Sequence, residues 1–177
     1  MKSLALALPL IAALTAPLVA QEAETSEPPM TLSRMAEIFT VLDPNVESAG
    51  NAFRLVITDI PVVIVTDEGA DRMRAMIPIR SAEGMDPEEM LRVMQANFDT
   101  ALDARYAIAQ GQLWATFIHP LSPLEKDQLI SGLGQVVNLA RTYGTLFTGG
   151  AMQFGGGDSQ QLHRDLIDKL LEKGEEI

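Results

Sequence analysis

Few side chains in this sequence are of the kinds that carry out chemistry, and their spacing assembles no catalytic or metal site. The chain has 177 residues, two histidines and no cysteine. His119 stands before a proline and His163 lies in a separate late segment, and neither has a histidine or carboxylate neighbour at ligand spacing. No serine lies in a Gly-x-Ser-x-Gly elbow. We therefore expect no enzyme activity, no bound metal and no cofactor.

Carboxylate clusters and a glycine run are the remaining candidates for chemistry. Asp99 and Asp103 lie four residues apart, where paired carboxylates can share acid–base work, but they flank an apolar helical stripe and should face solvent. The acidic turn at 67–71 does not match a calcium loop. The glycine-rich segment 149–157 lacks the Lys-Ser/Thr ending of a phosphate loop, so a flexible hinge is the better interpretation.

The arginines are the most informative charged residues. Arg54, Arg72 and Arg74 lie in segments with strand periodicity, and they alternate away from the apolar side chains. Arg80 follows the same alternation, and Arg105 begins a later strand. In an otherwise acidic protein these side chains would form a basic patch on the outer sheet face, suited to an acidic peptide or to the protein's own tail. Ordinary placement of polar residues toward solvent explains the same pattern.

The strand expected over 112–118 is apolar on both of its faces, so it should lie inside a sheet and not at its rim. The segment 62–65 is also continuously apolar. If helices cover one face of the sheet, then Trp114, Ile118 and the second face of 62–65 need a different cover. The tail helix, a second subunit and a client peptide are the three candidates.

Hydrophobic periodicity and end signals predict the order of elements. The expected helices cover 31–42, 86–102, 122–147 and 162–171, and the expected strands cover 53–58, 62–65, 72–80, 105–109 and 112–118. Ser122 and Glu125 make a capping box for the long helix. Pro78 suggests that its strand lies near an edge of the sheet or ends there. We thus expect an α+β fold of order α-βββ-α-ββ-α, with a five-stranded, mainly antiparallel sheet, helices packed on it and a C-terminal amphipathic helix.

Two helices carry more detailed expectations. The helix from Asp86 should bury a stripe of apolar side chains, with two more beside it: Leu91, Met94, Phe98 and Ala101, then Met90 and Leu102. Gly132 and Gly134 inside the long helix cost about 1 kcal/mol each relative to alanine. Close packing against another helix or a second subunit would explain them, and so would simple tolerance by a long helix.

The first twenty residues resemble a secretory signal peptide. Lys2 supplies a positive start, 4–19 is an apolar run, and Ala20 before Gln21 offers a cleavage point. Cleavage leaves 177 − 20 = 157 residues and moves the formal charge from −11 to −12. So acidic a chain repels nucleic acid, and without cysteine it has no disulfide. We expect a periplasmic protein with no membrane span after cleavage.

Three stretches carry a family resemblance: Asp103–Ile108, the hairpin into Leu113–Ile118, and the helix opening Leu121–Glu125. With the element order, they resemble YbjN-like proteins of the type III secretion chaperone-like (CesT/YbjN) fold, over roughly 31–147. Some proteins of this group are described as sensory transduction regulators. The resemblance implies a non-enzymatic domain that binds protein, often as a dimer. The signal peptide departs from cytosolic secretion chaperones.

These observations divide the chain into a signal peptide (1–20), a flexible leader (21–30), a YbjN-like domain (31–148), a glycine-rich hinge (149–159) and an amphipathic tail helix (160–177). We expect a protein-interaction or chaperone-like module of the bacterial periplasm. Its partner would be a protein or client peptide, with a homodimer as a further expectation. The contact residues would be Trp114, Ile118, Arg54, Arg72 and Arg74. A small-molecule binder or sensory domain using the same surface is the alternative.

Overall fold

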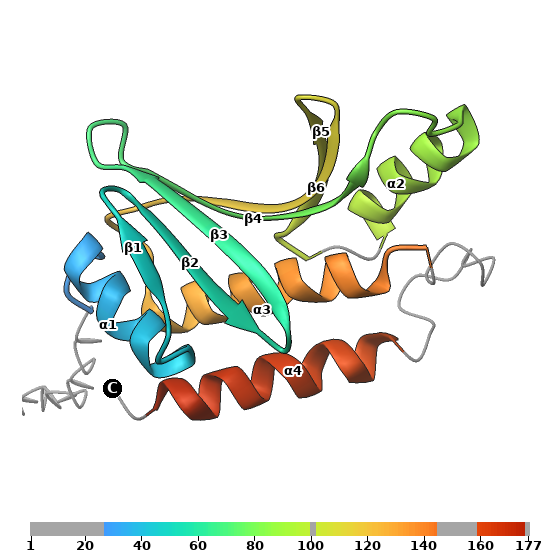
Figure 1. Cartoon of the computed structure of the whole chain (residues 1–177). Helices are drawn as coiled ribbons and strands as arrows, with labels where there is room; N and C mark the ends of the chain where they lie inside the picture. The colour runs from blue at the N-terminus through green and yellow to red at the C-terminus, as the bar shows by residue number, and fades with distance from the viewer. Residues whose placement is uncertain (1–26, 100–101, 145–158, 176–177) are drawn as a thin grey trace, which may run out of the picture.

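An antiparallel sheet with helices beneath one face forms the framework of the protein (Figure 1). The computed structural model describes residues 27–99, 102–144 and 159–175. Its helices are α1 (Leu32–Leu42), α2 (Pro87–Asp99), α3 (Lys126–Thr142) and α4 (Ser159–Gly174). Its strands are β1 (Glu47–Ala49), β2 (Ala52–Ile57), β3 (Ile60–Asp67), β4 (Arg72–Ser81), β5 (Arg105–Ala109) and β6 (Gln112–Pro120).

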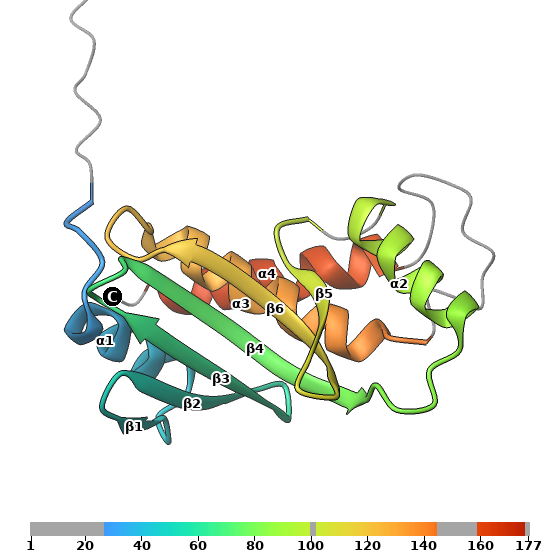
Figure 2. The same ribbon diagram turned by 90° about the horizontal axis from the view of Figure 1, so that it is seen from above.

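The strands form one sheet in the order β1-β2-β3-β4-β6-β5, with every neighbouring pair antiparallel (Figure 2). The predicted α+β class is confirmed, and β6 lies inside the sheet as its two apolar faces indicated. The additional strand is β1, which falls in a segment expected to be a loop. Its three residues are all exposed, so no alternation of polar and apolar side chains could reveal it.

Pro78 lies in a strand near the middle of the sheet, because β4 runs between β3 and β6. Of the two predicted positions for Pro78, an edge strand is therefore wrong, whereas a place near the end of its strand agrees with the end of β4 at Ser81. The pairing with β3 extends only to Met76, and the register with β6 shifts between Pro78 and Arg80. The proline thus occupies an irregular stretch at a bulge, where its missing N–H disturbs no regular ladder.

The long helix begins at Lys126 and not at Ser122. Ser122 is engaged elsewhere, because its backbone N–H and its hydroxyl donate to the Asp71 carboxylate at 2.7 and 3.0 Å. Gln128 instead accepts from the Glu125 backbone N–H at 3.3 Å, as in a capping box one turn later. The bonds from Ser122, with the Leu121 N–H donating to the Asp71 carbonyl at 3.1 Å, tie the β3–β4 turn to the start of the helical layer.

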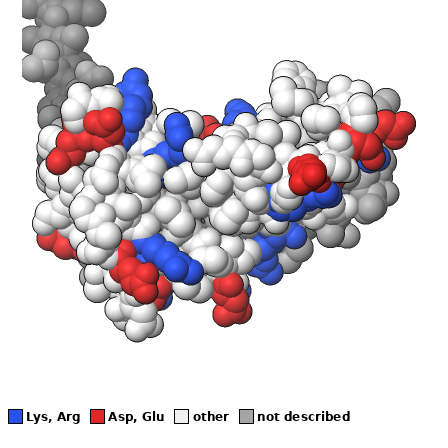
Figure 3. All heavy atoms as spheres, turned by 45° about the horizontal axis from the view of Figure 1, so that its top comes forward, with Lys and Arg blue, Asp and Glu red and all other residues white. Residues whose placement is uncertain are grey.

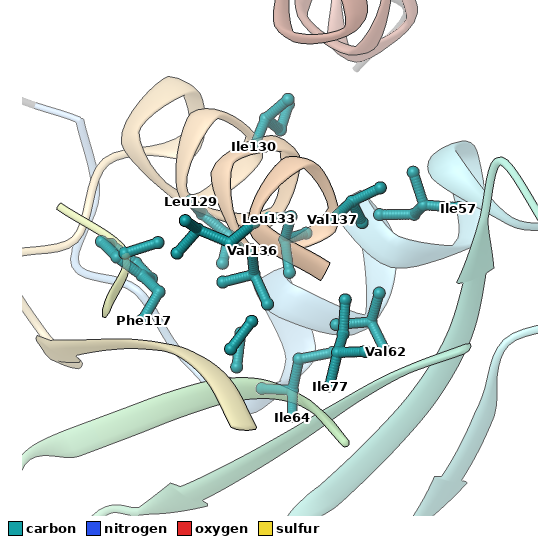
Figure 4. Packing of buried hydrophobic residues seen from close by; sticks show 14 of the residues in the cluster. Ile57, Val62, Ile64, Ile77, Phe117, Leu129, Ile130, Leu133, Val136 and Val137 are labelled. Carbon is teal, nitrogen blue, oxygen red and sulfur yellow. The ribbon is translucent and has the colours of Figure 1, made fainter. Parts of the chain in front are cut away.

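α3 lies between the sheet and α4, as the middle of three layers (Figure 1). Figure 4 shows Leu133 and Val136 pointing toward Ile64 and Ile77 of the sheet, while Ile130 points toward the other helix. Except for Ser131, every residue of α3 from Leu129 to Leu139 is buried. A helix enclosed from both sides needs apolar residues around most of its circumference. The tail helix therefore covers α3, and it does not cover the far side of the sheet.

Close packing explains both helical glycines. A Cβ added to Gly132 would lie 2.6 Å from the Phe117 ring of β6. A Cβ added to Gly134 would lie 2.8 Å from Cγ1 of Ile167 on α4. The first glycine lets α3 approach the sheet, and the second lets α4 approach α3. The contact partners are thus a strand and a helix of the same chain.

α2 is rotated relative to the sequence expectation. Leu91, Met94 and Phe98 are 63, 65 and 79% exposed, whereas Val93 and Ala96 are buried. Polar contacts account for this rotation. Glu89 pairs with Arg80 at 3.2 Å and accepts from the Tyr143 hydroxyl, and the Asn97 amide exchanges two hydrogen bonds with the Tyr106 backbone of β5, at 2.7 and 3.0 Å.

Several expectations concern residues outside the described part of the chain. These are the signal peptide, most of the leader, Ala101 and the glycine-rich segment 149–157. The side chains of Asp99 and His163 are not described either. Within the described residues, no helix is both long and apolar enough to span a bilayer.

Candidate functional site

The side of the sheet opposite α3, here called the outer face, has no described helix over it (Figures 1 and 2). Residues paired across neighbouring strands share a face. Arg54, Val63, Met76 and Thr116 pair in succession from β2 to β6 and make one row of this face. Val65, Arg74 and Ile118 make the next row. The outer face therefore combines apolar side chains with guanidinium groups.

Exposure and charge distinguish this face from an ordinary polar sheet surface. Val56 of β2 is 48% exposed and Ile118 of β6 is 52% exposed. Uncharged atoms occupy most of the surface in Figure 3, with separate patches of Lys and Arg. Water-exposed branched apolar side chains of this kind mark a surface that can bind a partner.

The arginines predicted for the site differ in their surroundings. The side chains of Arg54 and Arg74 make no ion pair or hydrogen bond within the described residues, although Glu47 is the cross-strand neighbour of Arg54. Arg72 donates to the Asp71 carbonyl at 2.8 Å, and Asp67 is its cross-strand neighbour, so its charge is partly matched. Arg80 is paired with Glu89 and is not part of the patch. Arg105 donates to backbone carbonyls beside it, including that of Ala104 at 2.8 Å.

A hollow of about 360 Å³ lies on the outer face where the β5–β6 hairpin rises above β4 (Figure 1). Eight residues line it: Arg74, Met76, Ala107, Ala109, Gln110, Trp114, Thr116 and Ile118. The structure thus brings together Trp114, Ile118 and Arg74 of the predicted contact set. It places Arg54 two strands away on the same face and Arg72 near the end of the strands.

The hollow owes its shape to the hairpin. Gln110 and Gly111 have φ of +53° and +71°, the conformation of a two-residue hairpin turn. The Trp114 indole N–H donates to the Ala109 carbonyl at 3.1 Å, which fixes the orientation of the ring. Ala107 is the cross-strand neighbour of Trp114, and its small side chain leaves the space beside the ring open.

Sequence reasoning missed five residues of the hollow: Met76, Ala107, Ala109, Gln110 and Thr116. One signal for small residues on one face was available in the sequence: Ala107 and Ala109 alternate with Tyr106 and Ile108. The pairing of β5 with β6 and β4 with β6, which creates the concave surface, was not readable from local pattern.

No protein-family model and no curated protein matches this sequence. Eight solved chains are similar to it in structure. Among them are type III secretion chaperones. SycH of Yersinia pestis, in complex with a fragment of YscM2, shares 14% identity with this chain at a TM-score of 0.45, covering 59% of this chain and 98% of the other.

Two further complexes have similar sequence identities, TM-scores and coverages. The HopA1–SchA chaperone–effector complex gives 11% identity and a TM-score of 0.46, over 62% of this chain and 95% of the other. The ExsC–ExsE complex gives 10% identity and a TM-score of 0.47, over 63% of this chain and 93% of the other.

A second, wider hollow gathers His119 with Asp103 and Asp127, which are distant in sequence. These three residues are the most enzyme-like group in the described part of the chain. A general base must lie within hydrogen-bonding reach of the group that it activates. The His119 Nδ1 lies 2.8 Å from the Pro120 carbonyl, and no described hydrogen bond or ion pair joins His119 to either aspartate. The described residues offer no cluster of metal ligands.

Proposed function

We propose that this protein is an exported, non-enzymatic protein-binding module whose partner docks on the outer face of the sheet. One observation carries the proposal: the outer face presents exposed Val56 and Ile118 beside the unpaired Arg54 and Arg74, and no described element covers it. Burying the apolar groups would stabilise a complex, and the guanidinium groups would select partners with acidic side chains.

Substitutions on two exposed surfaces test this proposal. The partner is captured from a periplasmic extract with the wild-type protein, identified, purified and titrated against variants by calorimetry. Val56→Asp and Ile118→Asp should each weaken binding by about tenfold or more, because each places a charge on apolar surface that the partner would cover. Ile108→Asp is the matched control, because Ile108 of β5 is 50% exposed but shares its face with the buried Leu113, on the other side of the sheet; it should leave the affinity within about twofold. Retained binding by both sheet variants would overturn the proposal.

Export is the second part of the proposal, supported by the pattern of residues 1–20. The protein recovered from a periplasmic fraction should begin at Gln21 and contain 157 residues when measured by intact mass. Blocking the signal with Leu10→Arg should leave the full-length chain in the cytoplasm. A full-length chain found in the cytoplasm without this substitution would contradict export.

A homodimer is the further partner that we propose, with the outward stripe of α2 as its interface. Leu91 and Met94 lie one helical turn apart and are both more than half exposed. Sedimentation should give a dimer for the wild-type chain and a monomer for the double variant Leu91→Asp with Met94→Asp. A wild-type monomer at micromolar concentration would rule this interface out.

The hollow also supports a second function class, a small-molecule binder or sensor. Its volume of about 360 Å³ lies within the range of ligand pockets, and its walls are mostly apolar with few polar groups. Native mass spectrometry of the periplasmic protein distinguishes this function from protein binding. A stoichiometric ligand of low mass that is lost in Ala107→Leu would favour the sensor.

A further inference from the structure

We infer that the hollow beside Trp114 is an anchor pocket for one apolar side chain of the partner segment, flanked in that segment by a carboxylate that pairs with Arg74. This inference rests on the proposed function and adds the chemistry of the occupant. It commits to an acidic, apolar stretch of a protein partner.

The hollow has room for at least one apolar side chain, and its walls are mostly apolar. Its volume of about 360 Å³ exceeds that of a single leucine or phenylalanine side chain and is small for a folded element. Trp114, Met76 and Ile118 are the large apolar residues of its lining. An aromatic or aliphatic anchor seated in such a pocket commonly contributes a large part of the binding free energy of an interface.

Charge selects the neighbour of that anchor. Arg74 is the one charged residue in the lining, and it has no ion pair or hydrogen bond within the described residues. A guanidinium group binds a carboxylate through two parallel hydrogen bonds. A nucleic acid phosphate would meet the same group, but the formal charge of −11 repels a polyanion over the rest of the molecule.

A buried hydroxyl in the lining is a further sign of an incomplete site. Thr116 lines the hollow, and its Oγ1 is buried with no hydrogen-bond partner in the described structure. Buried side-chain oxygens without a partner are rare in folded proteins, and a ligand or an ordered water usually completes their bonding. A backbone group of the seated segment, with a small movement of the lining, would supply that bond.

Contacts within the chain give the pocket its shape in the absence of a partner. The Trp114 N–H is bonded to the Ala109 carbonyl at 3.1 Å, and the tight turn at Gln110 fixes the hairpin that carries both residues. A pocket with few side chains to order loses little entropy when it is filled.

The surroundings of the hollow favour a peptide over a small ligand. The apolar surface continues from Met76 to Val63 along one row of the sheet, and Arg54 is the next residue of that row. A small molecule in the hollow would leave this row uncovered. An extended segment running from the hollow across the strands would cover it and would bring a second acidic side chain to Arg54.

Intrinsic fluorescence reports directly on this pocket, because Trp114 is the only tryptophan of the chain. The probes are nine-residue peptides of glycine and serine with a central Glu-Leu-Glu, Lys-Leu-Lys or Glu-Ser-Glu. The Glu-Leu-Glu peptide should change the Trp114 emission saturably and bind about tenfold more tightly than the other two. N-acetyl-leucine serves as the small-molecule probe and should bind far more weakly than the peptide.

Three variants distinguish contacts inside the hollow from the general effect of the protein's positive charges. Ala107→Leu fills the space beside Trp114 without changing charge and should abolish the response. Arg74→Gln should weaken binding of the Glu-Leu-Glu peptide by about tenfold and remove its advantage over Lys-Leu-Lys. Arg141→Gln is the matched control, since it removes the same charge from an exposed position at the end of α3, away from the outer face, and it should change the affinity by less than about twofold. Circular dichroism confirms the fold of each variant.

Each outcome decides the inference. Equal binding of the three peptides, equal losses in Arg141→Gln and Arg74→Gln, N-acetyl-leucine binding as tightly as the peptide, or no saturable response would each overturn it. If the protein partner is lost in Val56→Asp but retained in Ala107→Leu, the proposed function stands and the anchor pocket is wrong. If the peptide binds in the pocket but no protein partner depends on the outer face, the pocket stands and the proposed function is wrong.

Discussion

At the level of single residues, Asp43 is the carboxylate with the best-defined structural role. Its side chain accepts the Val56 backbone N–H at 2.8 Å and the Asn45 N–H at 2.9 Å, and the residue is buried at the end of α1. The hydrogen bond from Val56, followed by that from Asn45, holds the pKa of Asp43 below its usual value of 3.8. The charged form therefore fastens α1 to β2.

Asp43→Ala should lower the free energy of unfolding at pH 7 by about 1–3 kcal/mol, because two backbone donors lose their acceptor. The pKa is lower in the folded than in the unfolded chain, so the unfolded chain binds more protons in acid. The stabilisation is complete well above pH 3.8 and is lost as the pH falls through the folded pKa. Urea unfolding at pH 7 and at pH 3 should show the difference from wild type shrinking in acid.

Glu47→Ala is the control for this measurement, since the Glu47 side chain is exposed and makes no hydrogen bond or ion pair within the described residues. Its unfolding free energy should stay close to that of wild type at both pH values. A loss in Asp43→Ala that is the same at pH 7 and at pH 3 would show that packing, and not the charged carboxylate, matters at this position.

α2 provides the clearest test at the level of elements. Its larger apolar side chains face outward, and its smaller ones face the sheet. Val93→Ala should cost about 1–2 kcal/mol of unfolding free energy, because it deletes buried methyl groups. Leu91→Ala, which removes more atoms from an exposed position, should change it by less than about 0.5 kcal/mol. Thermal denaturation at low protein concentration, where monomers prevail, gives both values, and a larger loss for Leu91→Ala would mean that the helix is rotated.

This helix also shows where sequence reasoning reaches its limit. Helical spacing identified α2 and its apolar stripe, but it could not say which side docks. Docking is decided by Glu89 meeting Arg80 and by Asn97 meeting Tyr106, pairs that form only once the sheet exists. The same limit applies to Ser122, whose capping role was reassigned by the distant Asp71. Strand alternation, by contrast, was sufficient to place Arg74, Trp114 and Ile118 on one face.

The contact between α3 and α4 depends on a position without a side chain. Gly134→Ala would bring a methyl group within 2.8 Å of Ile167 Cγ1, so α4 must shift, at a cost of about 1–3 kcal/mol. Ile167→Ala removes the obstructing atom. In the double variant the loss should be smaller than the sum of the two single losses. Chemical denaturation of all four proteins measures the coupling, and strict additivity would show that the two positions do not meet.

At the scale of the whole molecule, the three-layer arrangement makes the tail helix part of the fold. α3 is buried on its sheet side and on its α4 side, where Leu166 and Leu170 pack as part of the core. Two hydrogen bonds fix the C-terminal end of α4: the Lys126 ammonium group of α3 donates to the Gly174 carbonyl at 2.9 Å, and the Lys173 ammonium group donates to the Leu42 carbonyl of α1 at 2.8 Å. α4 thus bridges α3 and α1, and its loss would expose apolar residues of both helices.

A chain that ends at residue 148 should therefore fail to reach the native state, although the family resemblance covers only 31–147. Its expected properties are a dye-binding apolar surface, loss of a cooperative thermal transition, and aggregation, because the side of α3 that includes Ile130 and Gly134 would face water. A synthetic peptide of residues 157–177, added in trans, should restore the transition, and the same peptide with Leu166→Asp and Leu170→Asp should not. A shortened chain with a cooperative transition at the wild-type temperature would show that folding does not need α4. A partner helix could then bind either to the uncovered side of α3 or to the outer face of the sheet.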